Sequence, residues 1–93
     1  MRVQRSLTAV TVTTAGTRVV LSATQKLCYK ITVEADKDNT GYIYLGDVTV
    51  ASTKYIARLG AGDSYTIDIG LTDVNKYYVD SSANSQKVQV SIA

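Results

Sequence analysis

Histidine, the side chain most often used for general acid–base catalysis, is absent from this chain of 93 residues, and so are proline, tryptophan and phenylalanine. Histidine is also the commonest metal ligand, so its absence removes the usual catalytic and metal-binding arrangements. No Ser–His–Asp triad can form. We therefore expect a protein that is not an enzyme and that holds no cofactor.

Cysteine and glutamate each occur once, at Cys28 and Glu34. A lone cysteine cannot form a disulfide within the chain, so nothing indicates an oxidising compartment. Cys28 has only Lys26 and Lys30 as nearby bases, which makes a nucleophilic role unfavourable. We expect Cys28 to be an inert, partly covered thiol.

Long hydrophobic runs are missing too, because no run approaches the roughly 20 residues that cross a bilayer. No segment has the pattern of a cleavable leader or of a low-complexity linker. The length suits one domain, residues 1–93. We expect a soluble protein that is made in the cytoplasm and has no membrane partner.

Charge is low, with a formal net charge of +2. Arg2, Arg5 and Arg18 make the first fifth of the chain basic, and no acidic residue precedes Glu34. This segment could contact an acidic partner surface, and a solvated strand face explains it equally well. The other basic residues are scattered, so we expect no nucleic-acid partner.

What the chain does contain is short segments with the alternation of β-strands. Along residues 27–35, five apolar side chains alternate with Cys, Lys, Thr and Glu, as in a half-buried strand. Turn-forming residues follow at 36–41, and a second β-prone run covers 41–45. This order predicts a β-hairpin. The same alternation places Tyr29 and Tyr65 in the core.

Similar patterns recur along the whole chain. We expect a loop or one helical turn at residues 70–75, and Val88, Val90 and Ile92 directed inward. The remaining strands are expected at residues 8–14, 17–21, 48–51, 55–59, 64–69, 76–80 and 87–93. The fold class is therefore all-β: a single antiparallel β-sandwich, jelly-roll-like, with about eight short strands.

Two polar segments have the composition of turns. Residues 36–47 partly match a calcium loop, with oxygen-bearing side chains at positions one, three and five, Gly41 at six and Asp47 at twelve. The flanking segments are strands rather than helices, so we favour a turn in which Asp and Asn bond to their own backbone and Gly41 is left-handed. Residues 60–63 predict a second turn, with positive φ at glycine and Asp63 bonded to backbone amides.

All seven aromatic residues are tyrosines. Tyr42 and Tyr44 share one face of a predicted strand, and tyrosine is common where protein surfaces associate. They belong either to an interface or to the rim of the core. A sugar-binding surface of Tyr and Asp is an alternative that the lack of tryptophan disfavours. Strand edges without proline favour a subunit of an assembly.

Several segments together resemble small virion proteins of tailed bacteriophages: GTRVVLS, ITVEADKDNTGYIYLGD, LGAGDSYTIDI, YYVD and KVQVSI. In those proteins a strand ends in Ala-x-x-x-Asn-Thr-Gly, continues through Ile-Tyr-(Leu/Val)-Gly, and is followed by a Leu-x-x-Gly-(Asp/Glu)-Ser turn and a Tyr-Val-Asp strand. The likeness covers residues 16–92. The matching residues are Ala35, Asn39, Thr40, Gly41, Ile43, Tyr44, Leu45, Gly46, Leu59, Gly62, Asp63, Ser64, Tyr78, Val79 and Asp80.

The resemblance implies a non-enzymatic β-sandwich that decorates or cements a capsid, or forms part of a head fibre. Its partner would be the major capsid protein or another virion protein, and its location the virion surface after synthesis in the host cytoplasm. A homodimer and a homotrimer are both compatible with a decoration role, because capsids offer twofold and threefold positions. The alternative is a carbohydrate- or receptor-binding module of a head or tail fibre. Residues 1–14 are the candidate docking strand or arm. The candidate partner-binding residues are Arg2, Arg5, Tyr42 and Tyr44.

Overall fold

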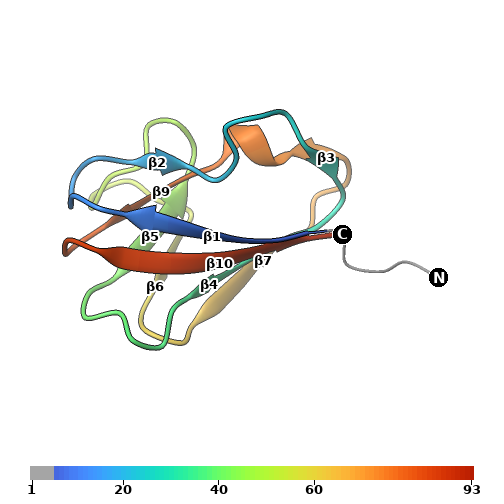
Figure 1. The fold of residues 1–93 in the computed structure, drawn as a ribbon. Coiled ribbons are helices and arrows are strands. Elements are labelled where there is room, and N and C mark those ends of the chain that lie inside the picture. The colour runs from blue at the N-terminus through green and yellow to red at the C-terminus, as the bar shows by residue number, and fades with distance from the viewer. Residues whose placement is uncertain (1–5) are drawn as a thin grey trace.

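Two four-stranded antiparallel sheets are formed by the alternating segments of the chain, in a computed structural model that describes residues 6–93 (Figure 1). The first, called here the β10 sheet, has the order β1 (Ser6–Val12), β10 (Gln86–Ile92), β4 (Ile31–Ala35), β7 (Ser64–Ile67). The second, the β5 sheet, has the order β2 (Val19–Val20), β9 (Tyr78–Ser81), β5 (Ile43–Gly46), β6 (Ala57–Leu59). The predicted all-β sandwich is confirmed.

A small ribbon closes one end of the sandwich. It pairs β3 (Leu27–Cys28) with β8 (Thr72–Asp73) and is followed by the 3-10 helix η1 (Val74–Lys76). The Asp73 carboxylate caps this helix by accepting a hydrogen bond from the Asn75 amide at 3.0 Å. The single helical turn allowed by the sequence is therefore present, displaced toward the end of the predicted segment.

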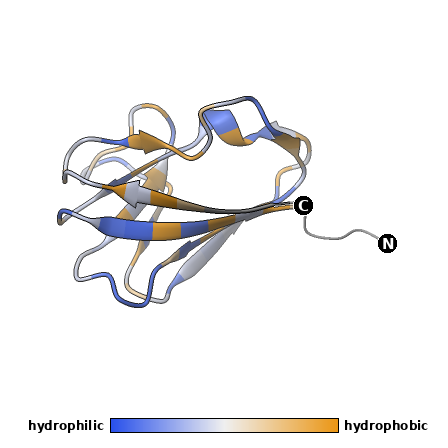
Figure 2. Cartoon of the chain, in the orientation of Figure 1, coloured by the Kyte–Doolittle hydropathy of each residue, from blue (hydrophilic) through white to orange (hydrophobic). Residues whose placement is uncertain are grey.

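The β10 strand lies in the middle of its sheet. It pairs with β1 from Ser6↔Ile92 to Val12↔Gln86, and with β4 from Val88↔Ala35 to Ile92↔Ile31. Figure 2 shows hydrophobic and hydrophilic residues alternating along it. Val88, Val90 and Ile92 are buried, as predicted.

The core fills the space between the two sheets. Ile31 and Val33 of β4 belong to the same buried cluster as Ile43 and Leu45 of β5, and all four are inaccessible to solvent. Burying an aliphatic side chain of this size contributes about 1.5–3 kcal/mol. The core therefore depends on a few β-branched and leucine side chains from each sheet.

The predicted hairpin over residues 27–45 is wrong. The β4 strand pairs with β10 and β7, whereas β5 pairs with β6 and β9 in the other sheet, so residues 36–42 cross between the sheets. Local alternation indicates strands but not their partners. Each of these strands finds two partners elsewhere in the chain.

Two tyrosines predicted in the core are exposed. Tyr29 is 50% exposed because the strand breaks there: the amides of Tyr29 and Lys30 both donate to the Ala93 carbonyl oxygen, at 2.9 and 3.3 Å. Tyr65 stands opposite the buried Val33 but lies on the edge strand β7, where the residue remains 40% exposed.

The predicted strand at residues 48–51 is also wrong. This segment is a turn, in which the Val50 amide donates to the Asp47 carbonyl oxygen at 3.0 Å and Ala51 makes a single bridge to Lys54. Val50 is buried against Gly46, where an added Cβ would approach Val50 Cγ2 to 2.9 Å. The apolar pattern thus reflects a packed loop rather than a strand.

Both predicted turns are present, with two differences. The Asn39 side chain bonds to the backbone of Lys87 rather than to its own: its Nδ2 donates to the Lys87 carbonyl oxygen at 2.8 Å, and its Oδ1 accepts the Lys87 amide at 2.9 Å. The Asp36 carboxylate accepts the Asp38 amide at 3.0 Å, Asp63 Oδ2 accepts the Gly60 amide at 3.0 Å, and Gly62 has φ +83°. Gly41 is not left-handed. Glycine is needed at this position because a Cβ would lie only 2.5 Å from Ser82 Oγ.

Candidate functional site

The outer face of the β5 sheet carries a tyrosine cluster. Tyr44 of β5 stands opposite Arg58 of β6 on one side and Asp80 of β9 on the other. Because side chains alternate along a strand, Tyr44 points away from its buried neighbours Ile43 and Leu45. The cluster therefore lies on the side of the sheet remote from the main core.

A loop over residues 47–56 folds back onto this outer face. Its Tyr55 ring packs on Tyr44 with centroids 5.2 Å apart and planes at 31°. Val50 from the same loop is 1% exposed, yet it lies outside the core cluster between the sheets. This cover explains why every residue of β5 is buried, including those that face outward.

Arg58 connects the cluster to a more exposed ring. Its guanidinium carbon lies 4.5 Å from the centroid of Tyr42, within the range of a cation–π interaction. Tyr42 is 46% exposed, Tyr55 43% and Ile56 51%, whereas Tyr44 is 8% exposed. We call Tyr42, Tyr44, Tyr55, Ile56 and Arg58 the tyrosine face. Of the two predicted residues, Tyr44 is thus rim packing and Tyr42 is available for contact.

An open pocket of about 130 Å³ borders the tyrosine face, lined by Gly46, Asp47, Lys54, Tyr55 and Ile56. Asp47 Oδ1 accepts hydrogen bonds from the Thr49 hydroxyl at 2.5 Å and the Thr49 amide at 2.8 Å. These bonds, the hydroxyl first, hold the pKa of Asp47 below its ordinary value. The pocket therefore combines an ionised carboxylate, an ammonium and an aromatic ring.

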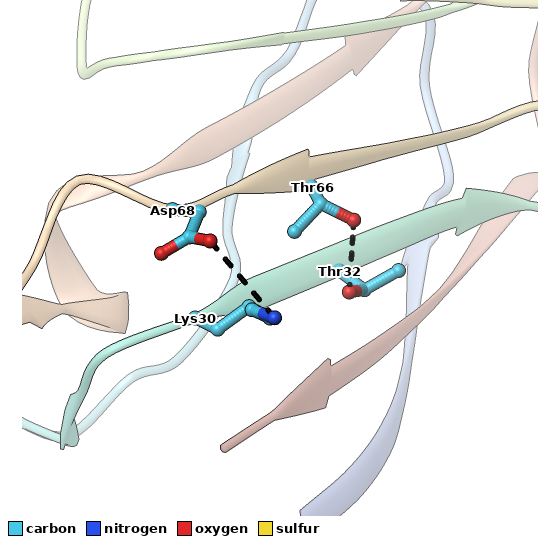
Figure 3. Close-up of polar contacts among 4 residues, drawn as sticks. All are labelled: Lys30, Thr32, Thr66 and Asp68. Atoms are coloured by element: carbon cyan, nitrogen blue, oxygen red, sulfur yellow. Dashed lines mark hydrogen bonds and ion pairs between the residues drawn. The ribbon is translucent and has the colours of Figure 1, made fainter.

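The outer face of the β10 sheet has a different character. Thr32 of β4 and Thr66 of β7 share a hydrogen bond of 3.1 Å between their hydroxyl oxygens (Figure 3). Glu34, Lys87 and Gln89 are exposed along the neighbouring positions. One outer face of the sandwich is therefore aromatic, and the other is polar.

Only part of the predicted docking arm, residues 1–14, lies within the described residues. Arg2 and Arg5 lie outside the described residues. Residues 6–12 form β1 and pair along their whole length with β10, so this part of the predicted arm is an edge strand of the sheet. Sequence reasoning missed Ile56, which lies in the loop that includes the wrongly predicted strand at residues 48–51. It also missed Arg58, which lies in a predicted strand but whose contact with Tyr42 depends on the pairing of β6 with β5.

Cys28 and the acidic residues were the candidates for a nucleophile and for a calcium site. Cys28 is buried, and burial raises the pKa of its thiol. Within residues 6–93, no group of three or more His, Cys, Asp or Glu side chains is arranged to hold a metal ion. Asp36 and Asp47, the ends of the candidate calcium loop, each close a separate turn.

No helix in the described part of the chain is both long and apolar enough to cross a membrane. Comparisons with protein-family models, with curated proteins and with solved structures found no match to this chain. The surfaces of the sandwich are therefore the features from which its function is inferred.

Proposed function

We propose that this chain is a non-enzymatic structural protein of a bacteriophage virion, a capsid decoration or cement protein that binds the major capsid lattice and stabilises the head. The observation that carries the proposal is the tyrosine face: a cluster of exposed aromatic and apolar side chains beside Arg58. Tyrosine and arginine are the side chains enriched where proteins bind one another.

The strand order supports this proposal at the level of architecture. If β3 and β8 are left out and the eight strands of the two sheets are renumbered 1 to 8 in chain order, the strand order is 1-8-3-6 in the β10 sheet and 2-7-4-5 in the β5 sheet. We propose that the sandwich is a jelly roll, whose two interlocked Greek keys have this arrangement and which occurs in viral capsid and lectin domains. A fold hosts many functions, so the proposal of a capsid role depends on the tyrosine face rather than on the architecture.

The mechanism is adhesion repeated over many identical sites. A tyrosine face that spans neighbouring capsid subunits would bury its rings and leave the polar face of the β10 sheet in solvent. Each contact is weak, but a ligand that binds only the assembled lattice stabilises it by mass action. Linked contacts then gain further through effective concentration. The basic residues Arg2 and Arg5 would add contacts to acidic capsid surface.

Cosedimentation with capsids tests the proposal. Purified chain is mixed with undecorated capsids of the phage whose genome encodes it, and Tyr42→Ala and Arg58→Ala are compared with Gln89→Ala on the polar face. We expect at least tenfold weaker binding for the first two variants and unchanged binding for the third. Full binding by both tyrosine-face variants would contradict the proposed surface, and no binding by the wild type would contradict the capsid role.

The N-terminal contribution is tested separately. Deleting residues 1–5 leaves β1 intact, whereas a deletion through residue 7 would remove two of its paired residues. We expect the shorter deletion to leave a folded protein with weakened capsid binding. Unchanged binding would remove Arg2 and Arg5 from the interface.

The pocket beside Tyr55 favours a second candidate, a carbohydrate- or receptor-binding module of a head or tail fibre. Sugars stack on aromatic rings and form hydrogen bonds to charged groups. The pocket of about 130 Å³ provides the ring of Tyr55 and the charged groups of Asp47 and Lys54. A glycan array separates the candidates. Specific hits that Tyr55→Ala abolishes, together with no capsid binding, would favour the module.

A further inference from the structure

A second exposed apolar cluster lies on the β3–β8 ribbon, at the end of the sandwich remote from β5 and β6 (Figure 1). Cys28 points inward and is 3% exposed, so its neighbours Leu27 and Tyr29 point outward, at 57% and 50%. Ile69 and Leu71, in the loop that leads into β8, are 72% and 61% exposed. We call Leu27, Tyr29, Ile69 and Leu71 the apical patch.

The register of the ribbon makes these side chains neighbours. Cys28 pairs with Thr72 and Leu27 with Asp73, and Ile31 pairs with Ile67, so residues 27–31 and 67–73 run side by side and hold all four residues of the patch. Between Ile69 and Leu71 stands Gly70, with φ +91°. This conformation suits glycine, and it holds the loop in the turn that presents both apolar residues.

The size of the apical patch matters for a chain this small. Side chains of these types and exposures leave on the order of 400 Å² of apolar surface in contact with water, within the 300–600 Å² of the largest patch on a typical monomer. Such a patch is about half of the roughly 800 Å² that each partner buries in a standard interface. With its polar rim it is large enough for a weak, reversible association.

Charges of both signs stand at the rim of the patch. Lys30 Nζ lies 3.9 Å from Asp68 Oδ2, and the two side chains are 51% and 64% exposed (Figure 3). A long, exposed pair of this kind contributes little within one chain. A positive and a negative group side by side do, however, make the rim complementary to a second copy of itself. The net charge of +2 adds little repulsion between copies.

We propose that the apical patch is a self-association surface that joins two copies of this chain about a twofold axis. In such an isologous contact the same surface is used twice, so Lys30 of each copy faces Asp68 of the other. The four apolar side chains of each copy cover those of its mate. An interface of this area is below the standard size, so the dimer is expected to be weak and reversible.

Sedimentation velocity of the purified full chain over a range of concentrations tests this proposal. The wild type is expected to sediment as a monomer below the Kd and as a dimer above it. Ile69→Ser and Leu71→Ser remove apolar surface that is mostly solvent-exposed, so the fold should persist while dimerisation weakens at least tenfold. Ile56→Ser, on the tyrosine face and similarly exposed, is the matched control and should dimerise like the wild type.

A charge exchange tests the twofold geometry directly. In a dimer of the Lys30→Asp variant, the new carboxylate at position 30 of each copy would face Asp68 of the other copy. In a dimer of the Asp68→Lys variant, two ammonium groups would face each other in the same way. Each variant alone should therefore be monomeric. An equimolar mixture of the two variants restores both opposite-charge pairs in the heterodimer and should recover the dimer. Low salt strengthens this recovery, because the pairs lie at the rim.

Three results would overturn the proposal. The first is a wild type that stays monomeric at a concentration of about 1 mM, where even a weak dimer is populated. The second is a dimer that Ile69→Ser and Leu71→Ser leave intact. The third is a mixture of charge variants that stays monomeric while the wild type dimerises. The assay contains no capsid. A failure of the capsid role and a failure of self-association are therefore separate observations.

Discussion

The Tyr55 ring packs against Tyr44 at a centroid distance of 5.2 Å, on the outer face of the β5 sheet. This contact fixes the loop over residues 47–56 to the sheet, together with the burial of Val50. The tyrosine face is therefore one packed unit in which a loop and two strands depend on each other. The stability of that unit can be measured without knowing its partner.

Tyr55→Ala is expected to lower the free energy of unfolding by about 1–2 kcal/mol, because an aromatic pair and its cover of Tyr44 are lost. Urea denaturation followed by tyrosine fluorescence measures the change. Tyr55→Phe keeps the ring and should stay within about 0.5 kcal/mol of the wild type. Equal loss in both variants would show that the ring contact is not the stabilising element.

Gln86→Ala is expected to cost about 3 kcal/mol, because a buried amide that satisfies backbone groups is removed. Gln86 is 3% exposed, and its Oε1 accepts the amides of Thr40 and Gly41 at 2.8 and 2.9 Å. Its Nε2 donates to the Asn84 carbonyl oxygen at 2.8 Å. Thermal denaturation measures the loss, with the exposed Gln89→Ala as control. A loss no larger than that of the control would contradict this role.

Gly41→Ala is expected to destabilise the fold by about 1–3 kcal/mol through overpacking. The new Cβ would lie 2.5 Å from Ser82 Oγ and 3.0 Å from Ala83 Cβ, and the hydroxyl cannot move freely because it accepts the Tyr42 amide at 2.8 Å. Chemical denaturation measures the cost. Wild-type stability would mean that the loop over residues 82–83 yields to the added methyl group.

Thr49→Val is expected to raise the pKa of Asp47 toward its ordinary value of 3.8, because the hydroxyl bond is the largest cause of its depression. Since the folded pKa is depressed, the stability linked to Asp47 is present above the unfolded pKa and is lost as pH falls through the folded pKa. The pH window therefore lies below 3.8. Carboxyl-carbon NMR titration follows Asp47 in both proteins. An unchanged titration curve would exclude the hydroxyl as the cause.

Sequence reasoning located most strands because their alternation is local. Val88, Val90 and Ile92 were placed inward correctly, since β10 is paired on both sides and packs one face on the core. Strand partners could not be obtained in the same way. The pairing of Val33 with Val90, rather than with β5, is a long-range contact that no local pattern encodes.

The candidate site was predictable only in part. Tyr42 and Tyr44 were identified from the interface preference of tyrosine, but their different burial depends on the loop that carries Tyr55. The exposure of Tyr29 depends on backbone bonds to Ala93, at the other end of the described chain. Both cases are tertiary effects that override a correct local pattern.

The central position of β10 constrains the order in which the protein can fold. Because β1 and β4 flank it and have no direct ladder with each other, neither can complete its sheet until residues 86–92 have left the ribosome. Pairings between such distant segments form slowly, and unpaired strands invite aggregation meanwhile. Protection by a chaperone during synthesis is therefore expected to raise the yield of this chain.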